Sequence, residues 1–128
     1  MLALALLLAQ PTQLAQPAPP APAAQQEEIR VVGQRLQNWR GKMFSRRGSD
    51  RCDTLVSSGD AEIDRVGCSA MAHCYAIHRA GLNEAARRRG AARNAHPVYR
   101  LMGVCVRDRR DLLVADLAER RYRARQGN

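Results

Sequence analysis

The sequence predicts an all-α protein: a small bundle of three to four helices that follows a short N-terminal extended segment and is stabilised by two disulfides. Apolar residues recur at spacings of three and four through the second half of the chain, a pattern typical of helices with one buried face. The four cysteines form an even set, as a disulfide framework requires. The 128 residues suffice for one domain after an N-terminal leader.

Residues 1–24 are predicted to be a signal peptide and Pro/Ala-rich leader. Leu2–Ala9 is an unbroken run of leucine and alanine, and the tract that follows ends in small residues that suit cleavage after Ala23 or Ala24. This run is less than half of the about 20 apolar residues that cross a bilayer, so we expect no transmembrane span. We therefore expect residues 25–128 to form a single small helical domain that is periplasmic or secreted. A proline-rich spacer that is never cleaved is the alternative.

The first part of the expected domain contains three short segments. Glu28–Gly33 alternates apolar and polar residues and is rich in β-branched side chains, which predicts a short strand. Gln34–Phe44 predicts a short helix, because three large apolar residues share one face and bring Trp39 into the core. Ser45–Ser58 is polar and contains glycine, and we expect a loop there that leads through Cys52.

Three helices are expected in the second half of the chain. The first begins after Asp60, which is positioned as its N-cap, and closes at Gly81. The second is rich in arginine and covers Glu84–Arg93. The last begins after Pro97 and keeps its apolar period to Arg123, which predicts a single helix of about 25 residues.

The cysteines are Cys52, Cys68, Cys74 and Cys105, and an exported chain would form two disulfides from them. Cys68 and Cys74 share a predicted helix, where a rise of about 9 Å separates them, beyond the about 7 Å that a disulfide spans. Two connectivities remain. We favour Cys52–Cys68 with Cys74–Cys105, because the second bridge would then link two helices through their apolar faces. Cys52–Cys74 with Cys68–Cys105 stays open.

The chain is strongly basic, with 21 lysine and arginine residues against 12 acidic ones and a formal net charge of +9. Such a charge suggests an anionic partner, such as a component of the cell envelope. An arginine bias can also follow from a GC-rich genome without selection for binding. Aromatic residues are too few and scattered for a base-stacking platform, so nucleic acid is not expected as the partner. The predicted anion-binding face comprises Arg87, Arg88, Arg89, Arg93, Arg107, Arg109 and Arg110.

One short segment resembles a known element. Glu28–Arg35 reads E-I-R-V-V-G-Q-R and resembles the E-I-V-V-T-G-Q-R element found after the signal peptide of many TonB-dependent outer-membrane receptors of Gram-negative bacteria. The resemblance covers eight residues, with Arg30 inserted in the apolar run and the threonine missing. It implies an envelope protein of a related bacterium. An alternative function is therefore contact with an envelope protein complex, by strand addition through Glu28–Gln34.

A metal-binding module is a further alternative. His73, Cys74 and His78 cluster on one predicted helix, and His96 would supply a fourth ligand. No C-x-x-C pair is present, so we expect the cysteines to be oxidised and no metal or other cofactor to be bound. The sequence also lacks a phosphate-binding loop, a nucleophile elbow and a metalloprotease motif, and disulfides would consume the thiolates. We therefore expect that the protein is not an enzyme.

Overall fold

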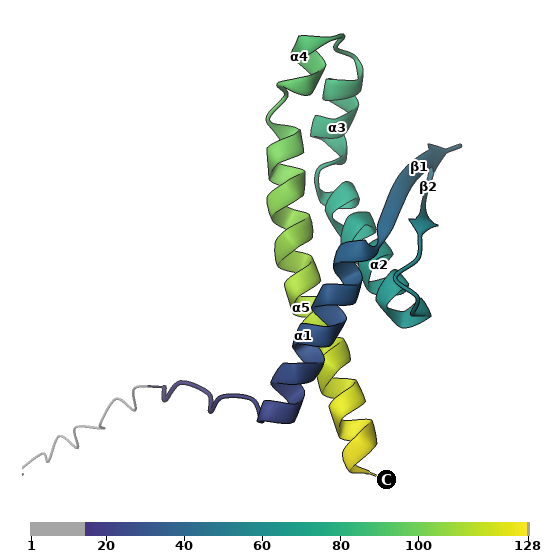
Figure 1. The fold of residues 1–128 in the computed structure, drawn as a ribbon. Helices are drawn as coiled ribbons and strands as arrows, with labels where there is room; N and C mark the ends of the chain where they lie inside the picture. Colours follow the sequence, from purple (N-terminus) through teal and green to yellow (C-terminus); the bar gives the residue numbers. More distant parts are fainter. Residues whose placement is uncertain (1–14, 128) are drawn as a thin grey trace, which may run out of the picture.

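The computed structural model describes residues 15–127, which are mostly helical with one two-stranded antiparallel sheet (Figure 1). The predicted all-α class is therefore correct only in its helical part. The elements in chain order are α1 (Ala23–Asn38), β1 (Arg40–Arg46), β2 (Ser49–Val56), α2 (Ala61–Ile77), α3 (Arg79–Ala86), α4 (Ala91–Asn94) and α5 (Val98–Gln126).

The long helix α5 organises the molecule. Helix α1 crosses its C-terminal half, α2 packs against it, and α3 and α4 lie beside its N-terminal part, at the end farthest from the C-terminus (Figure 1). The β-hairpin extends away from the helices on the side of α2 (Figure 1). The core lies where α1, α2 and α5 meet and contains Val32, Leu36, Trp39, Ile63, Val66, Val114 and Leu117.

Three predictions for the N-terminal half are wrong. The segment Glu28–Gly33 is not extended but lies in α1, and the helix predicted over Gln34–Phe44 ends at Asn38 and gives way to β1. The loop predicted over Ser45–Ser58 contains β2. Packing against α5 and α2 explains the first error: Glu28, Val32 and Leu36 fall four residues apart and are all buried, so tertiary contacts outweigh the β-branched side chains.

The second half of the chain follows the prediction more closely. Asp60 caps α2, accepting hydrogen bonds from the backbone N–H groups of Glu62 at 3.0 Å and Ile63 at 3.3 Å. Helix α5 follows Pro97 as a single helix. Gly81, however, does not end α2; it lies inside α3, where a Cβ would meet Val98 Cγ2 at 2.8 Å, so glycine allows α3 to approach α5.

The helix predicted over Glu84–Arg93 is interrupted. Helix α3 ends at Ala86, and a turn through Gly90, at φ +56°, separates it from the single turn of α4. Positive φ is a conformation that glycine adopts without strain, so Gly90 separates the two short helices.

The structure contains the favoured disulfides. Cys52–Cys68 spans 5.6 Å between Cα atoms and attaches the hairpin to α2. Cys74–Cys105 spans 5.8 Å and links α2 to α5. No cysteine in the chain is free.

The predicted leader overlaps the first helix. Its apolar run, Leu2–Ala9, lies outside the described residues. Residues 15–22 have no regular secondary structure, and α1 begins at Ala23, so the predicted cleavage site falls in its first turn. Among the described helices, none combines the length and the apolar character needed to cross a membrane.

Candidate functional site

The seven arginines predicted as one anion-binding face fall into two groups. Four lie at the end of the molecule formed by α3 and α4, and three lie on α5, where Arg107 follows the first residue of the helix by about 14 Å of rise. In the first group Arg88 pairs with Glu84 at 3.0 Å, and Arg93 donates to the carbonyl oxygens of Ala86 and Arg88. Two of the four are therefore engaged with their own chain.

The three arginines of α5 differ in their surroundings. Arg107 is exposed beside Asp108, at 3.4 Å, whereas Arg109 and Arg110 are half-buried. The guanidinium carbon of Arg110 lies 5.4 Å from the centroid of the Trp39 ring, a cation–π contact. Burial, and to a lesser degree the nearby charge of Arg40, lower the pKa of Arg110. Arg110 thus supports the core as well as carrying charge.

The hairpin gathers a second set of cations that the sequence analysis did not single out. Met43 pairs with Cys52 across the two strands, and Cys52 is bonded to α2, so this pair faces the helices. Successive side chains along a strand point to opposite sides, so the residues next to Met43 and Cys52 point to the outer side, away from the helices. We call this outer side the hairpin face; its charged and aromatic residues between Lys42 and Asp53 are Lys42, Phe44, Arg46, Arg51 and Asp53.

The hairpin face is basic and partly apolar. Arg51 and Asp53 pair at 2.6 Å, whereas Lys42 and Arg46 have no carboxylate partner among residues 15–127. The Lys42 ammonium lies 5.0 Å from the centroid of the Phe44 ring, and Phe44 is 39% exposed. A shallow groove of about 310 Å³ runs beside Phe44 and Arg46. The face therefore offers positive charge around an exposed aromatic ring.

The turn of the hairpin adds another cation in a strained conformation. Arg46 pairs with Ser49, so the loop has two residues, Arg47 and Gly48, and both have positive φ, at 50° and 76°. A Cβ crowds the backbone in this conformation, so glycine is favoured at the first of these positions, as is asparagine, whose short polar side chain can hydrogen-bond locally. Arg47 has no carboxylate partner among the described residues. A strained arginine at an exposed tip is the kind of outlier that motivates a functional hypothesis.

The inner side of the hairpin is held in three ways. The disulfide joins Cys52 to α2, the Trp39 indole donates to Thr54 Oγ1 at 3.0 Å, and Arg79 forms an ion pair with Asp50. A two-stranded hairpin is only marginally stable alone. The disulfide, the hydrogen bond and the ion pair stabilise the hairpin against unfolding and fix its orientation relative to the helices.

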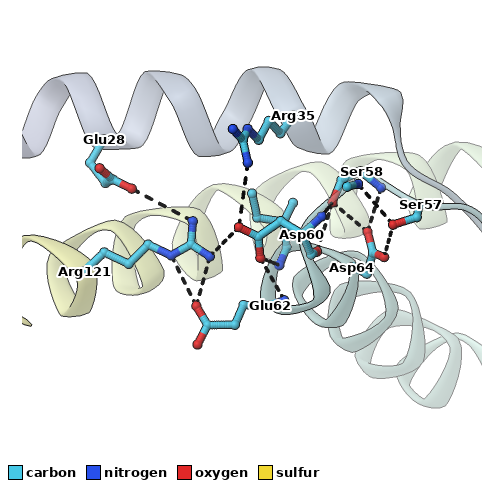
Figure 2. A network of polar contacts seen from close by, with 10 residues as sticks. Glu28, Arg35, Ser57, Ser58, Asp60, Glu62, Asp64 and Arg121 are labelled. Atoms are coloured by element: carbon cyan, nitrogen blue, oxygen red, sulfur yellow. Dashed lines mark hydrogen bonds and ion pairs between the residues drawn. The ribbon is translucent and has the colours of Figure 1, made fainter.

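The most extensive polar network joins α1, α2 and α5 (Figure 2). Arg121 of α5 donates to Asp60 at 2.7 Å and to Glu62 at 2.9 Å, and its guanidinium lies 3.9 Å from Glu28 of α1. Glu28 is only 6% exposed and also pairs with Arg125 at 2.7 Å. Glu28, Asp60 and Glu62 each have a cationic partner, so the network binds the three helices together.

The pKa values in this network fit a structural role. Burial acts to raise the pKa of Asp60, but hydrogen bonds from Arg121 and from the backbone N–H groups of Ile63 and Glu62 outweigh it, and the pKa lies below its usual value. Asp64 behaves alike, because hydrogen bonds from Ser57 and Ser58 outweigh its burial (Figure 2). Both carboxyls are therefore ionised at neutral pH, where a general acid would need a raised pKa.

The alternatives for metal binding and strand addition meet structural obstacles. Cys74 is bonded to Cys105, so its thiolate is not available as a ligand beside His73 and His78. Within residues 15–127, no group of three or more potential ligands lies close enough to hold an ion. The segment Glu28–Gln34 is helical with Glu28 and Val32 buried, so it would have to unfold before it could add to a sheet.

Comparisons of the chain with protein-family models, with curated proteins and with solved structures find no match.

Proposed function

We propose that this protein is a non-enzymatic, exported protein of the periplasm or extracellular space that binds an anionic partner through the hairpin face and Arg47. One observation carries the proposal: Lys42, Arg46 and Arg47 project from a fixed hairpin and form no ion pair among the described residues, since Asp53, the cross-strand neighbour of Lys42, pairs with Arg51. Two disulfides fit an oxidising compartment, which supports export.

Rigidity and an exposed ring, together with unpaired charge, favour the hairpin over the helical arginines as the binding surface, since Arg87 and Arg89 are exposed and unpaired as well. A cation that already has a carboxylate partner must give up that contact before it binds another anion, so its gain is reduced. Arg88 and Arg51 are in this position, whereas Arg47 is not. The hairpin also needs little ordering on binding, because the disulfide and the Trp39 contact already hold it.

A fluorescent dextran sulfate, followed by anisotropy, tests this proposal. The triple variant Lys42→Gln/Arg46→Gln/Arg47→Gln removes three charges from the hairpin. Each exposed contact contributes about 0.5–1 kcal/mol, so affinity should fall about 10- to 100-fold. Binding by the unmodified protein should weaken as salt rises from about 10 mM to about 150 mM, because the Debye length falls from about 30 Å to about 8 Å.

The matched control removes the same charge elsewhere. Arg87, Arg89 and Arg100 are exposed and have no ion-pair partner among the described residues, so their replacement by glutamine lowers the net charge equally. We expect this variant to lose less than about threefold in affinity. Equal losses in the two triple variants would mean that binding follows net charge alone, and the hairpin proposal would be rejected.

A further inference from the structure

We infer, on the basis of the proposed function, that the anionic partner is a phospholipid surface. Phe44 would lie at the boundary between the headgroups and the acyl chains, and Lys42, Arg46 and Arg47 would contact lipid phosphates. Charge alone would suit any anionic partner. A phospholipid surface is favoured by how the cations are spaced, by the ring between them, and by the rigidity of the hairpin.

The cations are spread out and do not converge. Lys42 and Arg46 lie four residues apart on β1, about 13 Å along the strand, and Arg47 continues the row at the turn. A small free anion is bound by donors that point at one spot, and the groove beside Phe44 instead includes Asp53, a carboxylate. A row of separate charges is complementary to an extended array of phosphates.

The ring distinguishes a lipid surface from a soluble polyanion. Phe44 lies between Lys42 and Arg46 on β1, with its ring exposed on the same side as both cations. Burying such a ring in an acyl boundary is favourable, and the flanking cations gain from the headgroup phosphates. A soluble anionic polymer offers the ring no apolar environment. A nucleic acid would use stacking, but Phe44 is the one aromatic residue on the hairpin face.

The rigidity of the hairpin favours binding through the small hairpin face, because little conformational entropy is lost. The bridge from Cys52 to α2 lies on the inner side, so the outer side is presented without competing contacts from the helices. In Figure 1 the turn of the hairpin is its outermost point, well away from α5. The turn is therefore the part of the hairpin that a flat surface would meet first.

Vesicle binding tests the inference, with the intact, oxidised protein. Vesicles of phosphatidylglycerol and phosphatidylcholine in equal parts are compared with pure phosphatidylcholine, by co-sedimentation. We expect binding only to the anionic vesicles. The Phe44→Ala variant should bind them about five- to tenfold more weakly while its affinity for dextran sulfate stays unchanged. The control Leu112→Ala removes a side chain that is 64% exposed on α5 and should change neither affinity.

A second variant reports insertion directly. Phe44→Trp places an indole on the hairpin face, whereas the native Trp39 is 1% exposed and keeps its environment. The emission of Phe44→Trp should shift to shorter wavelength with anionic vesicles and not with dextran sulfate.

The outcomes separate the inference from the function on which it rests. Binding to dextran sulfate without binding to anionic vesicles would overturn the lipid inference and leave the proposed function standing. A labelled single-stranded oligonucleotide that binds more tightly than the vesicles, with loss of binding in Phe44→Ala, would also overturn it in favour of a nucleic acid. Failure to bind either dextran sulfate or vesicles would reject both.

Discussion

Replacing Arg121 with methionine tests whether the network of Figure 2 holds the helices together. Methionine keeps most of the aliphatic length and removes the charge. The variant removes the 2.7 Å partner of Asp60, whose side chain is 18% exposed, and leaves it Arg35 at 3.9 Å. Glu28, whose side chain is 7% exposed, keeps Arg125 alone. Breaking a fully buried pair costs about 3–5 kcal/mol. Partial exposure here reduces the expected cost to about 2–3 kcal/mol, a large part of a typical total of about 5–15 kcal/mol.

The cost should depend on pH with a definite sign. The pKa of Asp60 is lower in the folded protein than its ordinary value, so its contribution is present above the ordinary value of about 3.9 and is lost as the pH falls through the folded value. Both proteins lose stability in acid. The gap between the unmodified protein and Arg121→Met should therefore narrow once the pH is well below about 3.9.

Urea unfolding followed by Trp39 fluorescence measures this gap, because the indole is buried in the folded state. The control is Arg123→Met, on the same helix, which breaks an exposed pair with Glu119 and should cost less than about 0.5 kcal/mol. A cost below about 0.5 kcal/mol for Arg121→Met would refute the structural role. A gap that is equal at neutral and acid pH would mean that lost packing, not charge, is responsible.

Three further predictions concern the core, a disulfide and the turn. Gly67→Ala should destabilise the protein by about 1–3 kcal/mol in urea, because the added Cβ would lie 2.6 Å from the buried indole, whereas Gly103→Ala, with no atom within 4 Å, should stabilise it by about 0.5–1 kcal/mol. Replacing both Cys74 and Cys105 with alanine opens a loop of 31 residues and should cost about 3–4 kcal/mol, measured as a fall in the urea midpoint. Arg47→Asn should raise stability by about 1 kcal/mol, since asparagine tolerates positive φ, and should weaken binding to anionic vesicles; a loss of stability would contradict the strain seen at this turn.

The features predicted correctly from the sequence are those with local causes. Asp60 announces the start of α2 because an N-cap needs only an acceptor side chain before a helical pattern. The long helix α5 follows from an unbroken apolar period after Pro97. Helix geometry excluded Cys68 with Cys74 and left two connectivities, of which the structure has the favoured one, with Cys74 bonded to Cys105 between two apolar helix faces.

The hairpin was missed because two periods compete over the same residues. Leu36 and Trp39 do enter the core, as a helical period predicts, but the chain changes to a strand between them and Met43. The sequence does carry a signal for the turn. Gly48 is a turn residue between Arg46 and Ser49, although arginine is unusual at the first position of a two-residue loop and the flanking segments do not alternate strictly.

Long-range contacts explain the remaining error, in α1. Glu28 is buried because Arg121 and Arg125, more than ninety positions later, turn toward it from α5. A carboxylate on a buried helix face reads as a surface residue until its partners are known, since an unpaired buried charge is costly. The residues around Glu28 do not reveal its partners on α5, and their alternation of apolar and polar side chains therefore predicted a strand instead of a helix.

The unpaired charge beside an exposed ring, more than the net charge of +9, is the reason for proposing the hairpin as the binding surface. On the helices, many arginines face carboxylates one turn away, as Arg120 does with Asp116 at 3.3 Å, so their fields are largely cancelled at short range. At the hairpin turn, Arg47 has no carboxylate partner among residues 15–127. Its positive φ would cost less backbone strain with asparagine at this position. A GC-rich genome would enrich arginine everywhere, and unpaired arginines such as Arg87 and Arg89 do lie on the helices, but codon bias would not explain why Lys42, Arg46 and Arg47 lie near an exposed ring on a fixed hairpin. That juxtaposition is therefore the feature that binding experiments should address.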